Sequence, residues 1–235
     1  MLNVPPPSPQ MEECRLAALY SYDVLGEGLN NELDNLVKLA AQIASTPKAY
    51  ITFVDQENVV FKASYGLVTK ERVFNRQDSI CQFAMYAKEA YIIPNIHASK
   101  DFVGSPFLNS IDQIVFYASF PLVDAEGFPL GCLCVVDDRV SHLTSLQIEA
   151  LETLSQQIIT HLSLRRKNLQ LAKQTQRSEE FINVFEASPE IHCILNRNGN
   201  ILFTNQAAYK LLGYQREEVL GKSIWSFCYM EDVVK

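Results

Sequence analysis

No apolar run in these 235 residues approaches the length of about 18 that a membrane-spanning helix requires, so we expect no contact with a membrane. The first ten residues, MLNVPPPSPQ, lack both the basic segment and the apolar segment of a secretory signal. Their prolines predict a disordered lead over residues 1–11. These absences together favour a cytoplasmic protein.

The six cysteines are scattered along the chain, and without a secretory signal they do not indicate a disulfide framework. Only Cys132 and Cys134 are close, and a Cys-x-Cys pair lacks the further ligands that a structural metal site needs. The net charge is −7, and the basic residues form no stripe beyond residues 165–167. We therefore expect no metal, no cofactor and no nucleic-acid partner.

Gly and Pro are absent between Thr144 and Ser188, and good helix formers fill this stretch. It predicts one continuous helix from about residue 143 to residue 187, which must end before Pro189. Such a helix greatly exceeds the average of about 11 residues in globular proteins, so we expect it to link two parts of the chain. An apolar stripe runs along its first half: Leu146, Leu151, Leu154, Ile158 and Leu162.

Two interpretations of this stripe remain open. The segment is either an ordinary terminal helix followed by a solvated linker, or half of a short parallel coiled coil between two protomers. Leu169 and Ala172 extend the stripe, whereas Gln176 and Glu179 interrupt it. We favour a homodimer through the long helix, because the polar second half would otherwise fray.

Before the long helix, strand-type segments with apolar residues on both faces lie between helical segments. Tyr50 and Thr52 alternate with Ile51 and Phe53, so both faces of the predicted sheet must be covered. The class is α+β, with an antiparallel sheet flanked by helices. Helices are predicted over residues 12–22, 30–44 and 79–90, and strands over 49–55, 59–66, 91–94, 114–123 and 128–138.

Six segments follow one another over residues 12–166, with a closing helix from about 143: RLAALYSYDVLGE, ELDNLVKLAAQI, AYITFVDQENVVFKASYGL, DSICQFA, FYASFPLVDAEGFPLGCLCVVDD and LQIEALETLSQQI. Together they resemble a GAF domain of the type found in bacterial sensor kinases and cyclases. The resemblance implies an antiparallel sheet with helices behind it and a loop-lined pocket in front, which binds a small molecule or only supports dimerisation.

Residues 167–180 are predicted to be a signalling helix, and residues 181–235 resemble the first half of a PAS domain. Two short strands meet at residues 197–200, a tight turn suited to positive φ. Asn205 and the segments LLGY and REEVLGK fall where the PAS pattern expects them. Because a full PAS domain is about twice as long, we expect the chain to be a fragment of a longer receptor with a truncated PAS-like α+β half-domain.

The GAF resemblance places a candidate ligand pocket in front of the sheet, lined mainly by aromatic side chains. Such residues either contact a small-molecule ligand or only fill the core, and the sequence leaves both interpretations open. The candidates are Phe53, Phe61, Cys81, Phe102, Phe107, Phe116 and Tyr117.

The sequence contains no recognisable effector. None of the four histidines is followed by the acidic residue of a kinase phosphoacceptor, and neither a Gly-rich nucleotide-binding box nor a GGDEF segment occurs. We therefore expect no catalytic residues and no enzyme activity in this chain. The interpretation is a GAF–PAS input module of a two-component sensor histidine kinase, acting in a phosphorelay, with a diguanylate cyclase as the alternative parent.

A second alternative is thiol chemistry, as a redox sensor or as a methionine sulfoxide reductase. Some small GAF-fold proteins resemble reductases of free methionine sulfoxide. Cys81 begins a predicted helix, where the helix dipole favours the thiolate. Cys132 and Cys134 project from one strand face and could resolve an oxidised Cys81. Against this, cysteines in apolar strands commonly serve as small buried hydrophobic residues.

Overall fold

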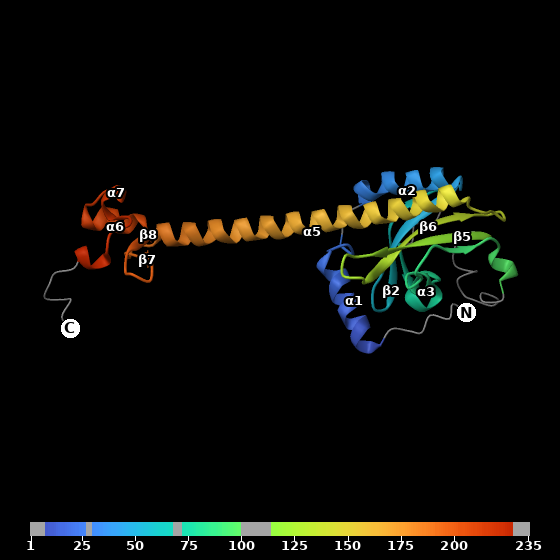
Figure 1. Cartoon of the computed structure of the whole chain (residues 1–235), viewed down its shortest axis with the longest axis horizontal. Coiled ribbons are helices and arrows are strands. Elements are labelled where there is room, and N and C mark those ends of the chain that lie inside the picture. The colour runs from blue at the N-terminus through green and yellow to red at the C-terminus, as the bar shows by residue number, and fades with distance from the viewer. Residues whose placement is uncertain (1–7, 27–29, 68–71, 100–113, 228–235) are drawn as a thin grey trace. The chain divides into compact units, whose positions relative to one another are not determined.

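The computed structural model describes residues 8–26, 30–67, 72–99 and 114–227 (Figure 1). The chain divides into two compact units, residues 1–167 and residues 168–235, and each is described by itself. Within the described ranges, no helix is both long enough and apolar enough to cross a membrane.

The first unit is built on a six-stranded sheet in which all neighbouring strands are antiparallel. The strand order is β3-β2-β1-β6-β5-β4, so the two central strands come from distant parts of the sequence. This sheet confirms the predicted α+β class. The strands are β1 (Lys48–Val54), β2 (Asn58–Tyr65), β3 (Val73–Asn75), β4 (Tyr91–Ile93), β5 (Phe116–Val123) and β6 (Pro129–Asp137).

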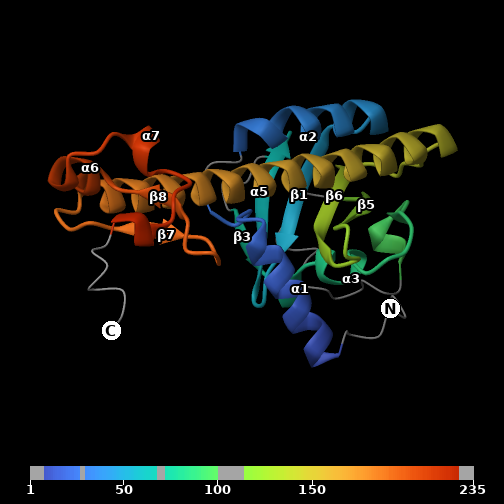
Figure 2. The same ribbon diagram turned by 60° about the vertical axis from the view of Figure 1, so that its left-hand side comes forward.

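Helices cover both faces of this sheet. The long helices α2 (Asn30–Ala44) and α5 (Ser145–Ala187) lie on one face, and α3 (Cys81–Ala84) lies on the other (Figures 1 and 2). The N-terminal helix α1 (Pro9–Ser21) and the short 3₁₀ turns η1 (Arg76–Asp78) and η2 (Ile96–Ala98) complete the described helical elements of this unit.

The helix predicted over residues 79–90 is wrong beyond its first turn, because only α3 is α-helical. Its buried residues, Ile80, Cys81, Ala84 and Met85, make up a single turn of apolar contact with the sheet. Most helical stability in proteins comes from such packing. Residues 85–90 form turns and bends that lead into β4, so the helix does not continue.

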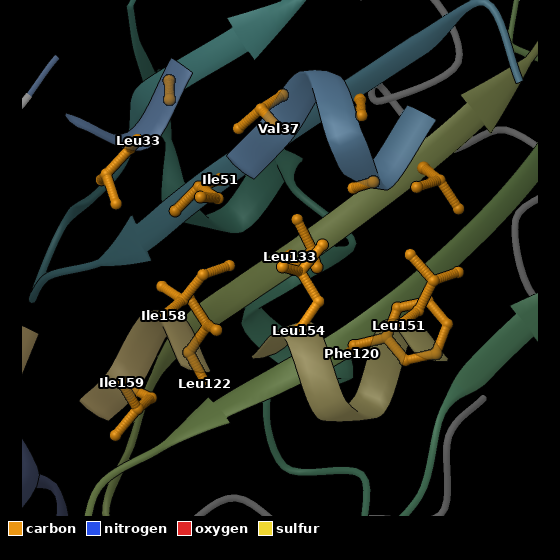
Figure 3. Close-up of a cluster of buried hydrophobic side chains, with 14 of the residues drawn as sticks. Leu33, Val37, Ile51, Phe120, Leu122, Leu133, Leu151, Leu154, Ile158 and Ile159 are labelled. Carbon is orange, nitrogen blue, oxygen red and sulfur yellow. The ribbon is translucent and has the colours of Figure 1, made fainter. Parts of the chain in front are cut away.

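The core between the long helices and the sheet combines residues from distant segments. Figure 3 shows Val37 of α2 and Leu154 of α5 over Leu133 of β6, with Phe120 of β5 beside them. Each of these side chains is at most 6 % exposed. Amphipathic helix faces and the apolar alternation of the strands thus produce one dry layer.

Most of the apolar stripe of the long helix is buried within this core. Leu151, Leu154, Ile158 and Leu162 are buried against the sheet of the same chain, whereas Leu146 is 76 % exposed. A contact between two protomers would therefore need other positions on α5.

The long helix α5 begins at a capping box, in which the Thr144 hydroxyl accepts from the backbone NH of Gln147 at 3.3 Å.

The second unit contains the predicted two-stranded hairpin and the helical segments after it. Its elements are β7 (Cys193–Leu195), β8 (Ile201–Thr204), α6 (Gln206–Leu212), α7 (Arg216–Val219) and η3 (Ile224–Phe227). The strands pair antiparallel, and Gly199 in the turn between them has φ +76°. Glycine adopts this conformation without steric cost.

Asn205 fastens the end of α5 to the hairpin. Its fully buried side-chain amide donates to the carbonyl oxygens of Phe185 (3.0 Å), Ser188 (3.3 Å) and Glu190 (2.8 Å). Its carbonyl oxygen accepts from the backbone NH of His192 at 3.0 Å. A single side chain therefore satisfies carbonyl groups that the helix end leaves without partners.

Gly131 should be the least replaceable glycine of the sheet. A Cβ at this position would lie 1.9 Å from the carbonyl oxygen of Thr52 on the neighbouring strand. We expect Gly131→Ala to lower the free energy of unfolding by about 3 kcal/mol. Urea unfolding followed by far-UV circular dichroism measures this loss. The control is Gly127→Ala, where φ is +89° but no atom lies within 4 Å, and about 1 kcal/mol is expected; equal losses would contradict the steric argument.

Asn205→Ala should destabilise the second unit selectively, because it removes four hydrogen bonds to partly buried backbone groups. We expect a loss of about 2–3 kcal/mol. The single tryptophan, Trp225, lies in this unit, so its fluorescence during urea unfolding reports the change. Asn198→Ala, in the exposed turn, is the matched control and should leave the midpoint unchanged.

Candidate functional site

Polar side chains gather on the sheet face that is covered by α3. Tyr50 and Thr52 of β1 are paired with Cys134 and Cys132 of β6, and Ser119 of β5 is paired with Cys134 on its other side. Paired residues in neighbouring strands project from the same face. All five side chains are completely buried. The strand register therefore builds a compact polar patch inside an otherwise apolar layer.

Three thiols and a phenol meet where α3 crosses this patch. The sulfur of Cys81, the first residue of α3, lies 3.9 Å from the sulfur of Cys134. The Tyr117 hydroxyl lies 3.6 Å from the Cys81 sulfur and 3.5 Å from the Cys134 sulfur. The Cys132 thiol points to the carbonyl oxygen of Cys81 at 4.0 Å. We call Cys81, Cys132, Cys134 and Tyr117 the thiol cluster.

Three buried hydroxyls on this face lack a hydrogen-bond partner within the described part of the chain. They belong to Tyr50, Thr52 and Ser119. A buried hydroxyl without a partner costs free energy, and most such groups in proteins are hydrogen-bonded. These three hydroxyls therefore add hydrogen-bonding capacity to a layer that is otherwise apolar.

The surroundings shift the pKa values of the three thiols in different directions. Hydrogen bonds from the thiols of Cys132 and Cys134 hold the pKa of Cys81 well below its usual value, and the Tyr117 hydroxyl acts in the same direction. Burial raises the pKa of Cys132 and of Cys134 well above the usual value. Cys81 is thus the thiol of the cluster that is most readily deprotonated.

Over the described residues, no three His, Cys, Asp or Glu side chains are placed to hold a metal ion.

The structure does not bring all the predicted pocket residues together. Phe61, Cys81 and Tyr117 lie on the α3 face of the sheet. Phe53 and Phe116 lie on the opposite face and pack in the core beneath α2 and α5. This split follows from the alternation of side chains along a strand, which places neighbours such as Phe116 and Tyr117 on opposite faces.

The remaining two predicted residues, Phe102 and Phe107, lie outside the described residues. Sequence reasoning did not include Tyr50, Thr52 and Ser119 in the site. The signal for the first two was present, since they alternate with Phe53 and therefore cannot share its face. A signal for Ser119 was present as well, since it lies two residues after Tyr117 on the same strand and therefore shares its face.

Glu12 of α1 forms a second polar centre at the edge of the α3 layer. Its carboxylate makes a bidentate ion pair with Arg15, with distances of 2.7 and 2.8 Å. It also pairs with Arg76 of η1 at 2.6 Å and accepts from the Tyr86 hydroxyl, just after α3, at 2.8 Å. Burial raises the pKa of Glu12, but the hydrogen bonds from these three residues outweigh it and lower the pKa to about 2.

Arg15 connects the Glu12 carboxylate to the two central strands of the sheet. Its side chain is buried, and its guanidinium donates to the carbonyl oxygens of Val54 (2.8 Å) and Pro129 (3.3 Å). These two residues are the last of β1 and the first of β6, the central strands. A planar guanidinium with five donors suits such a junction of a carboxylate and two carbonyls.

The other end of α1 contacts α5 near the end of the first unit. The Tyr22 hydroxyl lies 3.3 Å from the Ser163 hydroxyl, and the Arg166 guanidinium stacks 4.1 Å from the centre of the Tyr22 ring. Arg166 also donates to the Ser21 hydroxyl at 2.9 Å. Helix α1 therefore touches both the α3 region and the long helix.

Comparison with protein-family models identifies both halves of the chain. A GAF domain model matches residues 28–162, which is more than half of the sequence. The chain belongs to the GAF domain family. A PAS fold model matches residues 179–232 and confirms the order of a GAF domain followed by a PAS domain. The chain therefore carries two sensory domains used in signal transduction.

One curated relative is the cyclic di-GMP phosphodiesterase PA2567 of Pseudomonas aeruginosa, which is 33 % identical over 132 residues. The match covers 56 % of this chain and 22 % of that protein, so the chain spans only a minor part of the relative's length.

Two solved structures are also similar. The GAF domain of the Acinetobacter phosphoenolpyruvate-protein phosphotransferase is 15 % identical, with a TM-score of 0.49, 66 % of this chain and 91 % of that chain covered. The free methionine-R-sulfoxide reductase of Neisseria meningitidis is 12 % identical, with a TM-score of 0.48, 68 % of this chain and 88 % of that chain covered.

Glu12→Gln should lower the free energy of unfolding of the GAF domain, by an amount that depends on pH. The pKa of Glu12 is lowered from 4.5 to about 2 in the folded protein. Its contribution is therefore fully present above pH 4.5 and is lost as the pH falls toward 2. At pH 7 we expect the variant to lose about 2 kcal/mol, because charge-assisted hydrogen bonds weaken and Arg15 stays buried.

The measurement is urea unfolding of the wild type and the variant between pH 7 and pH 2.5. The difference in the free energy of unfolding between wild type and variant should become smaller below pH 4.5. Glu13→Gln is the matched control, since Glu13 is the adjacent exposed carboxylate. A pH-independent difference would show that the charge of Glu12 is not what holds α1 in place.

Proposed function

We propose that this chain is a cytoplasmic sensory input module in which the state of the α3 face of the GAF domain is passed through α1 to α5. A small molecule at the polar patch, or a partner that displaces α3, would be the input. The observation that carries the proposal is the position of Glu12, which binds Tyr86 after α3 and Arg76 of η1 from a helix that also contacts α5.

The first step of this path depends on charge-assisted hydrogen bonds, which are short and directional. A movement of α3 shifts the Tyr86 hydroxyl, and the Glu12 carboxylate either follows it or loses that hydrogen bond. Helix α1 is 13 residues long and can transmit such a shift along its axis as one element.

The second step lies at the other end of α1. Ser21 and Tyr22 hold the Arg166 guanidinium, and Arg166 is on α5 close to the end of the first unit. A displacement of α1 changes how this part of α5 is supported. Coupling free energies of about 1–3 kcal/mol are sufficient to shift a two-state equilibrium of this kind.

We propose that the output is a change in the pairing of two α5 helices in a homodimer. Leu164 and Leu171 are seven residues apart on α5 and are 56 % and 61 % exposed, although both are large and apolar. A heptad spacing places them on the same side of the helix, as in the seam of a coiled coil. These residues replace the buried stripe as the candidate contact.

The effector of the parent protein is a further part of the proposal. The resemblance to GAF–PAS inputs of two-component sensors favours a histidine kinase that acts in a phosphorelay. The curated relative that is named as a cyclic di-GMP phosphodiesterase favours, as a second candidate, an enzyme of cyclic di-GMP turnover. Phosphohistidine formation and cyclic di-GMP levels in cells that express the parent protein distinguish the two.

A cysteine cross-linking experiment tests the dimer and its coupling together. In a background with Cys14, Cys193 and Cys228 replaced by Ser, we expect Leu171→Cys to give a disulfide-linked dimer under mild oxidation. Lys173→Cys is the matched control, because two residues correspond to about 200° around a helix and place it away from the seam.

Adding Glu12→Gln to the Leu171→Cys variant should change the rate of cross-linking by about tenfold, if the coupling is about 1.4 kcal/mol. An unchanged rate would contradict the path through α1 while leaving the dimer in place. Equal cross-linking at positions 171 and 173, or none at either, would contradict the dimer itself.

A further inference from the structure

The thiol cluster contains a pair of sulfur atoms poised for a reaction that a ligand-binding face does not require. Cys81 and Cys134 lie 53 residues apart in the sequence, yet their sulfurs are only 3.9 Å apart. Cys81 is 1 % exposed and Cys134 is fully buried. Neither thiol forms a disulfide in this structure, in which both are free.

We propose that Cys81 and Cys134 are a modification site at which a hydroperoxide converts the two thiols into a disulfide. The inference rests on the proposed function, because it makes the α3 face respond to an oxidant as its input. The chemical class of the substrate is a small hydroperoxide, with hydrogen peroxide as its simplest member.

The surroundings of the pair differ from those of an inert buried cysteine. The Tyr117 hydroxyl is within 3.6 Å of both sulfurs, and unpartnered hydroxyls of Thr52 and Ser119 lie on the same face. These groups can hydrogen-bond to a peroxide, which is close to water in size and polarity. Local opening of α3, a single helical turn, gives such a molecule a route to the sulfurs.

The acidities assign the two roles. Cys81 is the nucleophile, because the neighbouring thiols lower its pKa, whereas burial raises the pKa of Cys134. Its thiolate attacks one peroxide oxygen and the O–O bond breaks. The other oxygen leaves as an alcohol or as water after taking up a proton, and Cys81 becomes a sulfenic acid.

The second step closes the disulfide. The Cys134 sulfur attacks the Cys81 sulfur, the S–O bond breaks, and the hydroxyl leaves with the Cys134 proton as water. Two thiols lose two electrons in total, and the hydroperoxide gains them to give an alcohol and water. The Tyr117 hydroxyl, in contact with both sulfurs, is placed as a positioning residue that relays this proton.

Cys132 is placed less directly than Cys134 to act as the resolving thiol. Its thiol points to the backbone carbonyl oxygen of Cys81 at 4.0 Å, whereas the Cys134 sulfur lies 3.9 Å from the Cys81 sulfur itself. It also cannot readily bond to Cys134, because residues two apart on a strand are about 6.6 Å apart with parallel side chains. Cys132 therefore serves as an internal control within the same cluster.

We expect closing the disulfide to pull α3 toward β6. A disulfide has an S–S distance of about 2.05 Å, so the sulfurs must approach by about 2 Å from their present separation. Side-chain rotation supplies part of this approach, and a shift of α3 toward β6 supplies the rest. Tyr86 follows α3 directly and binds Glu12, so oxidation acts at the start of the proposed path to α5.

The test uses the full chain with Cys14, Cys193 and Cys228 replaced by Ser. The protein is treated with hydrogen peroxide, denatured, alkylated, digested and analysed by mass spectrometry. We expect a peptide pair linked through Cys81 and Cys134, loss of two alkylation sites, recovery of both on reduction, and an alkylated Cys132.

Two variants separate the roles of the thiols. Cys132→Ser should still form the link. Cys134→Ser should give no link and should instead accumulate a sulfenic acid on Cys81 that dimedone traps. The proposal is overturned if Cys81 and Cys134 both remain alkylatable in peroxide-treated folded protein, or if Cys132 is the linked residue.

Failure of the oxidation and failure of the proposed function give different results. If Leu171→Cys cross-linking responds to Glu12→Gln but no Cys81–Cys134 link forms, only the oxidation is wrong. If the link forms while the proposed dimer is not captured, the modification site stands and the relay through α5 fails.

Discussion

The pairing of β1 with β6 is the constraint on which the first unit depends. These two strands are about 80 residues apart in the sequence, and Gly131 leaves the room that the Thr52 carbonyl needs when they pair at the centre of the sheet. Once they are paired, every side chain on them is assigned to one face or the other. One face meets α2 and α5, and the other receives α3.

The two faces have different physical characters. Beneath α2 and α5 the layer is apolar, and its role is to fix the first half of the long helix to the domain. Beneath α3 the layer contains thiols and hydroxyls that are buried without full hydrogen bonding. Natural cores keep such groups rarely, and places that break the usual packing rules are often functional. We therefore infer that the α3 side of the GAF domain is its functional face.

Helix α1 connects these faces, since its Leu19 packs in the core beneath α2 and α5 while its polar side chains reach the α3 layer. Arg15 binds the ends of both central strands, Glu12 binds the α3 layer, and Tyr22 receives Arg166 from α5. The low pKa of Glu12 keeps its charge throughout the physiological range, so its links break by displacement and not by protonation. This is the arrangement that the proposed signalling path requires.

Periodicity alone predicted a large part of the fold. The segments of β1, β5 and β6 and the extent of α5 were correct, because alternation and an uninterrupted run of helix formers are local properties. The predicted helix over residues 79–90 failed because its length depends on how much of it the sheet can cover. The predicted pocket mixed two faces, since Phe53 and Tyr117 look equally apolar in the sequence.

The sequence by itself thus determined the order of the elements, the family and the face that each strand residue shares with its neighbours. Only the tertiary structure decided which face α3 covers, that Cys81 meets Cys134, and that Glu12 binds residues 64 and 74 positions away. The physical reason is that backbone periodicity is set by local geometry, whereas contacts between distant side chains depend on the register of strands that the chain pairs only on folding.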